Sequence, residues 1–217
     1  MNFFIIGDVH GCFYTLEKIL SHWNVDEEHL IFLGDLIDRG NYSARVLTTC
    51  MELQKSYPNC IILKGNHEYE FTEHYDKGGN PNWVRQCGEK TLEDFNRNHL
   101  DYKKIRDWCK ALPLQYETEH IMITHAGITE TEDPYWEDGE DSVLWTRKAL
   151  KNIDKLQIHG HTPLKRNEPL FNETSHSINI DTGAVYGYGL TGLKVSDQAS
   201  VLDIINIETD ERDIMFL

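Results

Sequence analysis

The chain has 217 residues, of which 40% are hydrophobic and 26% are charged, and this length and composition predict a soluble globular protein of one domain. Its 21 basic and 36 acidic side chains leave a net charge of −15. An acidic surface repels other polyanions, so the charge argues against general binding to nucleic acids or to anionic membranes. A local positive site is still compatible with this balance.

Neither a membrane span nor a secretory leader is expected. No apolar run approaches the length needed to cross a bilayer. The apolar residues 3–6 are too few for a signal peptide and follow no basic start. The five cysteines are odd in number, widely spaced and free of CxxC pairs. This usage predicts reduced thiols and a cytoplasmic location.

Short apolar runs that end in a glycine or a polar residue recur along the chain. They cover residues 3–6, 30–33, 61–63, 121–124 and 156–158. Such runs are typical of strands buried on both faces. Helical spacing separates the first three runs, over residues 16–23 and 46–51, the second with Ser43 as its N-cap. Alternating strands and helices predict βαβ units in a largely parallel sheet.

The chain changes character after His67. Residues 69–100 are polar and lack strand signals, so we interpret them as a cap or insert within a single domain of residues 1–217. Apolar spacing at residues 105–112 predicts a helix. Further on, short stretches rich in Ile, Val and Leu predict antiparallel strands that form a second sheet. These stretches lie at residues 177–180, 190–195, 200–205 and 213–216. The predicted fold is therefore α/β, a two-sheet β-sandwich flanked by helices.

Polar residues follow several of these strands, at the end where parallel sheets bind their ligands. Six of them have metal-binding side chains: Asp8, His10, Asp35, Asn66, His125 and His161. Oxygen and nitrogen ligands suit manganese, iron or zinc. Six ligands exceed the needs of one tetrahedral zinc ion, but they suffice for two divalent ions about 3.5–4 Å apart that share one carboxylate. Two such ions would attract a phosphate group despite the acidic surface.

Hydrolysis of a phosphate ester also needs a proton donor for the leaving oxygen and cations for the phosphate oxygens. His67 follows Asn66 directly and could donate that proton. Asp38 is the nearest candidate to hold its imidazole. Arg39 follows Asp38, and its guanidinium matches phosphate geometry.

Some residues near this set have competing interpretations. His159 could replace His161 as a ligand, because the two flank the same glycine. Asp181 fits a turn or cap better than a metal site. The Trp and Tyr residues between positions 69 and 136 suit packing within the cap better than base stacking.

Several sequence blocks resemble the signatures of a known family. They are GDVHG at residues 7–11, GDLIDRG at 34–40, GNHE at 65–68, HAG at 125–127 and GHTP at 160–163. In this order they resemble the phosphoprotein phosphatase family of the calcineurin-like metallophosphoesterases. LWTR at 144–147 resembles a segment that supplies a second phosphate-binding arginine. IDTGAV at 180–185 is similar to a segment of small phage and bacterial members, such as the lambda phage serine/threonine protein phosphatase.

The resemblance implies the calcineurin-like metallophosphoesterase fold and a role for each matching residue. Asp8 and His10 would bind one metal ion, and Asp35 would bridge it to the second. The second ion would be bound by Asn66, His125 and His161. His67 would be the general acid, oriented by Asp38. Phosphate would be bound by Arg39, Asn66 and Arg147, the last on a stretch that we interpret as helical. The resemblance also implies direct attack by a hydroxide that bridges the two metal ions. We expect these ions to be manganese in vitro, with iron or zinc as alternatives.

We therefore predict a phosphomonoesterase that hydrolyses phosphoserine and phosphothreonine in a phosphoprotein partner, and phosphotyrosine as well. A symmetrical diadenosine tetraphosphatase shares the same core and is the first alternative. A non-catalytic metal-binding scaffold is the second, but it would be expected to lack the acid or an arginine. A metal-dependent nuclease is a third alternative, but it would be expected to have a basic groove, and the sequence shows none. Residues 69–120 match the family only loosely and are expected to shape the substrate cleft. The oligomeric state stays open.

Overall fold

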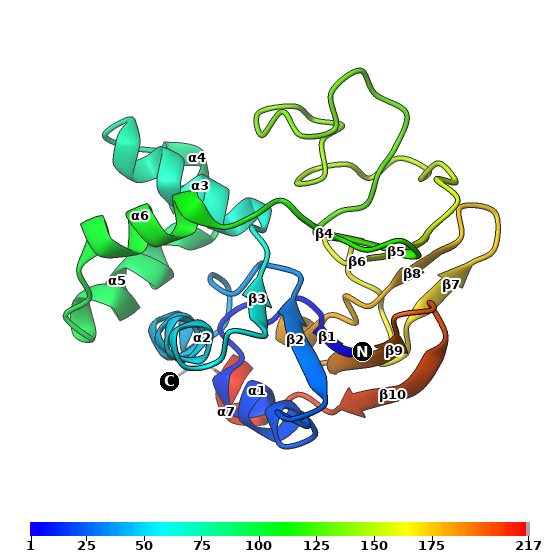
Figure 1. The fold of residues 1–217 in the computed structure, drawn as a ribbon. Helices are drawn as coiled ribbons and strands as arrows, with labels where there is room; N and C mark the ends of the chain where they lie inside the picture. The colour runs from blue at the N-terminus through cyan, green and yellow to red at the C-terminus, as the bar shows by residue number, and fades with distance from the viewer. Residues whose placement is uncertain (216–217) are drawn as a thin grey trace.

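The apolar runs form strands of two five-stranded sheets in the computed structural model, which describes residues 1–215 (Figure 1). The first sheet contains β1 (Asn2–Ile6), β2 (Glu28–Phe32), β3 (Cys60–Ile62), β9 (Leu190–Ser196) and β10 (Val201–Ile207). The second contains β4 (Gln115–Glu117), β5 (Ile121–Thr124), β6 (Leu156–His159), β7 (Leu170–Asn172) and β8 (Ser177–Asn179). The sheets pack face to face with helices outside, which confirms the predicted α/β two-sheet sandwich.

The pairing of the C-terminal strands differs from the prediction. β1, β2 and β3 are parallel, as expected. β9 and β10, however, join the first sheet as an antiparallel pair beside β1, and they do not form a second sheet with β8. β8 instead pairs parallel to β6. Leu193 and Val195 of β9 share the apolar layer between the sheets with Phe3 and Ile5 of β1. Alternation of apolar residues shows that a segment is a strand, but it does not show which sheet the strand joins.

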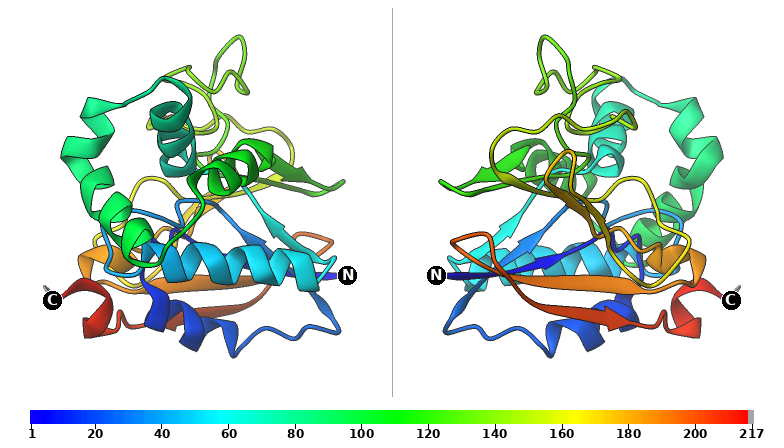
Figure 2. Two further views of the ribbon diagram at one scale, coloured as in Figure 1. Left: turned by 90° about the vertical axis from the view of Figure 1, so that its left-hand side faces the viewer. Right: turned by 90° about the vertical axis from the view of Figure 1, so that its right-hand side faces the viewer.

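β1 is buried on both of its faces, which explains its continuous apolar run. Phe3 and Ile5 belong to the layer between the two sheets. Phe4 and Ile6 pack on the opposite face of the first sheet, against α1 (Phe13–Leu20) and α2 (Ser43–Ser56), the two helices that lie along this sheet in Figure 2. Each such buried side chain contributes roughly 1.5–3 kcal/mol of hydrophobic stabilisation. The strands are therefore held firmly up to the point where their polar residues begin.

Two local predictions on this side of the sheet are wrong. Ser43 is the first residue of α2 and not its N-cap, because its Oγ accepts a hydrogen bond from the Asp38 backbone N–H at 2.9 Å. The predicted strand at residues 213–216 is replaced by a short helix, α7 (Glu211–Ile214), and Phe216 lies outside the described residues. The Asp213 carboxylate accepts hydrogen bonds from the backbone of Thr15 at 2.8 Å, and so caps the first turn of α1.

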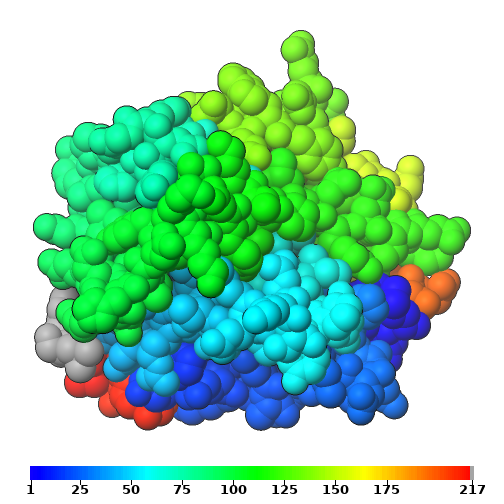
Figure 3. Space-filling model, turned by 60° about the vertical axis from the view of Figure 1, so that its left-hand side comes forward, coloured from blue at the N-terminus to red at the C-terminus, as the bar shows by residue number. Residues whose placement is uncertain are grey.

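Residues 69–100 contain no strand, as predicted, but they are helical rather than loop-like. The segment from β3 to β4 folds into α3 (Asn66–Asp76), α4 (Pro81–Trp83), a π-helical turn η1 (Val84–Gly88), α5 (Glu89–Arg97) and α6 (Tyr102–Ala111). These helices lie together on one side of the molecule (Figure 1), and their surface adjoins that of α2 and β3 (Figure 3). Only a few large apolar side chains of this segment are buried, so its sequence shows no clear helical periodicity of apolar residues before position 105. Among the described residues, no helix is both long and apolar enough to cross a bilayer.

Replacing Phe95 by Ala should lower the free energy of unfolding by about 3–5 kcal/mol, because the ring is fully buried in α5. Phe95 packs in one apolar cluster with Phe4 of β1. We therefore propose that the helical segment and the sandwich form one folding unit, whose urea transitions by circular dichroism and tryptophan fluorescence coincide. Glu93→Ala, at an exposed position of α5, is the matched control. Two separate transitions would contradict this proposal.

Candidate active site

The carboxyl ends of strands from both sheets converge at one edge of the sandwich. β1 leads to Asp8 and His10, β2 to Asp35 and β3 to Asn66, whereas β5 and β6 of the second sheet lead to His125 and His161. Each of these six side chains is more than nine-tenths buried. The structure thus brings together every residue predicted to bind metal.

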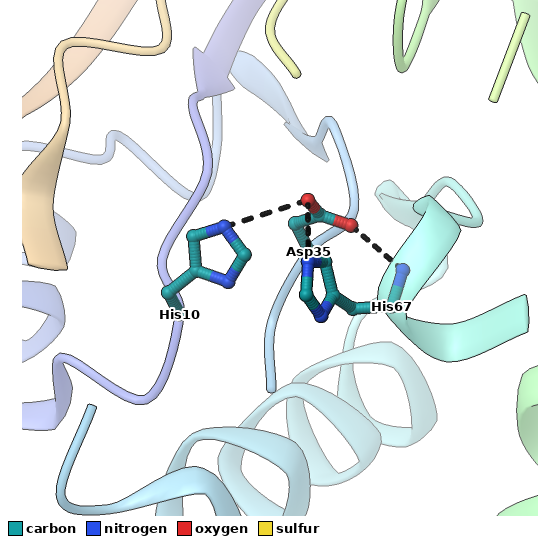
Figure 4. A group of neighbouring side chains, drawn as sticks. All are labelled: His10, Asp35 and His67. Atoms are coloured by element: carbon teal, nitrogen blue, oxygen red, sulfur yellow. Dashed lines mark hydrogen bonds and ion pairs between the residues drawn. The ribbon is translucent and has the colours of Figure 1, made fainter. Parts of the chain in front are cut away.

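Asp35 is the point at which the two halves of the site meet. Its Oδ2 atom lies 3.5 Å from His10 Nε2 and 3.5 Å from His125 Nε2. Its Oδ1 atom accepts a hydrogen bond from the His67 backbone N–H at 3.0 Å. Figure 4 shows Asp35 between the rings of His10 and His67. Of the groups able to hold a metal within the described residues, two contain Asp35, one with His10 and His67 and the other with His125 and His161.

In both His10 and His125, the Nδ1 atom faces a backbone carbonyl, while Nε2 faces Asp35. His10 Nδ1 lies 2.9 Å from the oxygen of Ile37, and His125 Nδ1 lies 3.0 Å from the oxygen of Leu33. A carbonyl accepts hydrogen bonds only, so each of these nitrogens carries the proton. Burial lowers the pKa values of both rings, which are therefore neutral. The Nε2 lone pair of each ring consequently points toward Asp35, as in metal-binding histidines.

His161 presents its other nitrogen to the same centre. Its Nε2 atom lies 3.1 Å from the backbone oxygen of Trp145, which leaves the lone pair on Nδ1. Burial and the neighbouring His125 lower the pKa of His161 to about 3. Its Nδ1 atom lies 2.9 Å from Asn66 Oδ1 and 3.2 Å from His125 Nε2. Three acceptor atoms thus face one another with no proton between them, and a cation is the group that such a set accommodates.

Asp8 adds a carboxylate that has a hydrogen-bond donor at only one of its two oxygens. Its Oδ2 atom accepts a hydrogen bond from the His161 backbone N–H at 3.1 Å, but its Oδ1 atom is buried without a partner. Burial, reinforced by the nearby Asp181 and Asp35, raises the pKa of Asp8. A Cβ atom at Gly160 would lie 2.0 Å from Oδ1, so a glycine is required beside this carboxylate. A bound cation would satisfy both the orphaned oxygen and the unfavourable charge.

The two residues with competing interpretations have hydrogen-bond contacts of their own. Asp181 holds the turn that follows β8, because its Oδ1 atom accepts a hydrogen bond from the Gly183 backbone N–H at 3.1 Å. His159 is the last residue of β6, and its Nδ1 atom lies 3.3 Å from the oxygen of Gly160. His161 lies with Asp35 and His125 in a group that could hold a metal ion, and its choice over His159 as the ligand stays a prediction.

His67 and Asp38 form a buried pair beside the centre. His67 Nδ1 lies 2.5 Å from Asp38 Oδ2. Burial opposes a charge on His67, but the carboxylate of Asp35 and the hydrogen bond to Asp38 raise its pKa above the usual value. Asp38 also accepts hydrogen bonds from Trp83 Nε1 at 2.6 Å and from the Thr91 hydroxyl at 2.5 Å. Trp83 and Thr91 lie in the helical segment, and no sequence signal linked either residue to Asp38.

Five of the nine non-glycine residues with positive φ among those described belong to this site. Positive φ angles, which non-glycine residues rarely adopt, occur at His10 (45°), Asp35 (49°), Asp38 (75°), Arg39 (68°) and His161 (68°). Each conformation of this kind costs about 1–3 kcal/mol and persists only where the surroundings enforce it. The cost falls on residues predicted to carry the chemistry.

Glu68 is one source of that enforcement, and the residue analysis assigned it no role. Its carboxylate accepts hydrogen bonds from the backbone N–H groups of Asp35 at 2.8 Å, Leu36 at 2.9 Å and Gly65 at 2.9 Å. A Cβ atom at Gly65 would lie 2.2 Å from the Asp35 nitrogen, so only glycine allows this close approach of the two loops. The available signal was the position of Glu68 at the end of the GNHE block.

Two arginines line the cleft over the centre. This cleft has a volume of about 150 Å³, and its walls include Arg39, His67, Trp145, Arg147 and His161. Arg39 Nη1 lies 2.5 Å from His10 Nε2. Arg147 is exposed and lies in an irregular segment rather than the helix we had expected. Two arginines thus line the same hollow as Asn66 and His161 of the acceptor cluster.

Comparisons with known proteins agree with this architecture. A family model described as calcineurin-like phosphoesterase matches residues 1–188. An asymmetrical bis(5'-nucleosyl)-tetraphosphatase PrpE of Bacillus cereus is 28% identical, over 93% of each chain.

Two solved structures share the fold. A structure described as a putative diadenosine tetraphosphatase has a TM-score of 0.68 at 18% identity and covers 96% of this chain and 95% of its own. A protein serine/threonine phosphatase of Saccharomyces cerevisiae with similarity to human phosphatase PP5 has a TM-score of 0.69 at 15% identity and covers 97% and 81%. The family match spans both sheets up to residue 188, and with it the chain belongs to the calcineurin-like phosphoesterase family.

Proposed function

We propose that the chain is a phosphohydrolase that uses two divalent metal ions and cleaves the phosphoanhydride chain of dinucleoside polyphosphates. The main support for metal-dependent hydrolysis is that unprotonated acceptor atoms converge next to a cleft lined by two arginines. Support for the substrate class comes from the Bacillus cereus relative, which matches along 93% of both chains and is named for asymmetrical bis(5'-nucleosyl) tetraphosphate cleavage. We had expected the symmetrical type as the alternative, whereas this relative is named asymmetrical.

The donor atoms suit two ions that share Asp35. Asp8, His10 and Asp35 would hold one ion, and Asn66, His125 and His161 would join Asp35 at the other. When bound, a pair of such ions lowers the pKa of water and neutralises charge on a phosphate group. Manganese, iron and zinc all accept this set of oxygen and nitrogen ligands.

The protein's own side chains would position the phosphate and supply the proton. Arg39 and Arg147 would bind its non-bridging oxygens, with Asn66 beside them. His67 would donate the proton on Nε2 to the leaving oxygen as the bond from phosphorus to that oxygen breaks, because its Nδ1 atom is held by Asp38 at 2.5 Å. No covalent phosphoenzyme is required, since water adds directly to phosphorus.

A second candidate function is hydrolysis of phosphoserine and phosphothreonine in proteins, which was our expectation from the sequence. The His67–Asp38 pair favours it. A serine or threonine alkoxide is a poor leaving group and gains much from a proton donor, whereas a nucleotide phosphate leaves without one. Both functions share the same centre, so turnover separates them.

Direct comparison of two substrates tests the proposed function. With Mn²⁺, kcat/KM for diadenosine tetraphosphate should exceed that for a phosphoserine peptide, and chromatography of the products should show ATP and AMP. ADP as the sole product would indicate symmetrical cleavage. Phosphate release from the peptide alone would favour the protein phosphatase instead.

His67→Asn should reduce kcat for a phosphoserine peptide by about 10²–10⁴-fold, because the leaving alkoxide loses its proton donor. The loss on diadenosine tetraphosphate should be smaller, since its leaving phosphate is already a weak base. His22→Asn, at an exposed position, controls for loss of a histidine. Unchanged rates with unchanged metal content would reject His67 as the acid.

Asp35→Asn should lose metal at both positions, because the carboxylate shared by the two groups gives up its charge. We expect the affinity for Mn²⁺ to fall by at least about tenfold. Metal content after dialysis, measured by plasma mass spectrometry, checks this. Asp26→Asn, at an exposed position, should retain its metal, and full occupancy of the Asp35→Asn variant would contradict the bridging assignment.

A further inference from the structure

A second hollow lies next to the cleft and has a different character. Its volume is about 170 Å³, and it is lined by Pro163, Leu164, Lys165, Tyr186 and Tyr188. The two tyrosines are open to solvent, with 51% and 40% of their surfaces exposed. We call this hollow the tyrosine pocket. It combines two aromatic rings and one cation, and neither tyrosine entered the predicted site.

Arg39 links the tyrosine pocket to the phosphate cleft. The Arg39 guanidinium, which lines the cleft, lies 6.0 Å from the centre of the Tyr186 ring. On the other wall, Pro163, Leu164 and Lys165 follow His161 after a single residue. A ligand whose phosphate contacts Arg39 in the cleft would therefore have the Tyr186 ring close to the rest of its chain.

The aromatic wall is built on a rigid turn. Tyr186 ends the short helix η2 (Ala184–Tyr186), and glycines in left-handed conformations flank it, with φ of 74° at Gly183 and 83° at Gly187. The Tyr186 backbone N–H donates to the oxygen of Gly183 at 3.0 Å. A Cβ atom at Gly183 would lie 3.1 Å from the Tyr188 ring. The turn therefore fixes the backbone that presents both tyrosines to the pocket.

We propose that the tyrosine pocket binds one nucleobase of a dinucleoside polyphosphate, which stacks on Tyr186 or Tyr188. This inference rests on the proposed function and specifies its substrate as an aromatic base attached to a phosphate chain. Lys165 lines the pocket and Arg39 lies near the Tyr186 ring, so two cations are available to a phosphate chain in a protein of net charge −15. Base-to-aromatic stacking is sequence-tolerant, because every base has a π-face.

The test compares two substrates that both contain phosphoanhydride bonds, one with nucleobases and one without. The ratio of kcat/KM for diadenosine tetraphosphate to that for inorganic tripolyphosphate is measured in the Mn²⁺-loaded full chain. Replacing both tyrosines by alanine should lower this ratio by about tenfold to a hundredfold. Tyr186→Phe with Tyr188→Phe should preserve it, because the rings remain. Tyr57→Ala, an open tyrosine before β3, is the matched control. An unchanged ratio in the alanine variant would overturn the proposal.

A second measurement separates failure of this inference from failure of the proposed function. If the wild-type chain cleaves only the phosphoserine peptide, the proposed nucleotide activity fails. Calorimetric titration with adenosine, which carries no phosphate, then decides the pocket alone. Binding that disappears in the alanine variant and persists in the phenylalanine variant would support the tyrosine pocket as a base site. Equal heats in all variants would reject it.

Discussion

The structure depends on one electrostatic constraint, which is the burial of several unprotonated acceptor atoms at a single point. Backbone carbonyls of Ile37, Leu33 and Trp145 face the outer nitrogens of the imidazoles, so the remaining lone pairs point inward toward Asp35 and Asn66. A protein interior tolerates such a set only when a cation compensates it. The two sheets supply the rigidity, because the site takes residues from the strands of both. Burial of the strands therefore serves to hold groups together that repel one another.

That constraint also accounts for where strain is stored. The loops after β1 and β2 pass through left-handed conformations at His10, Asp35 and Asp38. Glu68 holds the backbone of the β2 loop, while Ser43, Trp83 and Thr91 hold Asp38. These supports come from α2 and from the helical segment between β3 and β4. The segment that sequence analysis treated as a cap is thus part of the framework that orients His67.

Much of the site could be predicted from the sequence, because its ligands lie in short blocks directly after apolar strands. Asp8, Asp35 and His161 could be grouped on that basis alone. The supporting contacts could not be predicted, since Trp83 and Asp38 are distant in the chain and meet only through packing. The strand β9 shows the same limit: its apolar alternation marked a strand, but its pairing with β1 depends on the shared layer between the sheets. Local pattern determines the type of an element, whereas its partners depend on the whole fold.

The metal-binding residues do not determine the substrate class. The centre and the two arginines serve any phosphate group, so discrimination falls to what lies around the cleft. His67, paired with Asp38, lines the cleft, and its proton is most important when the leaving group is strongly basic. Beside the cleft lies the tyrosine pocket, which would recognise a flat aromatic group joined to the phosphate. A phosphoserine side chain itself carries no aromatic ring, whereas a dinucleoside polyphosphate carries a base at each end of its phosphate chain.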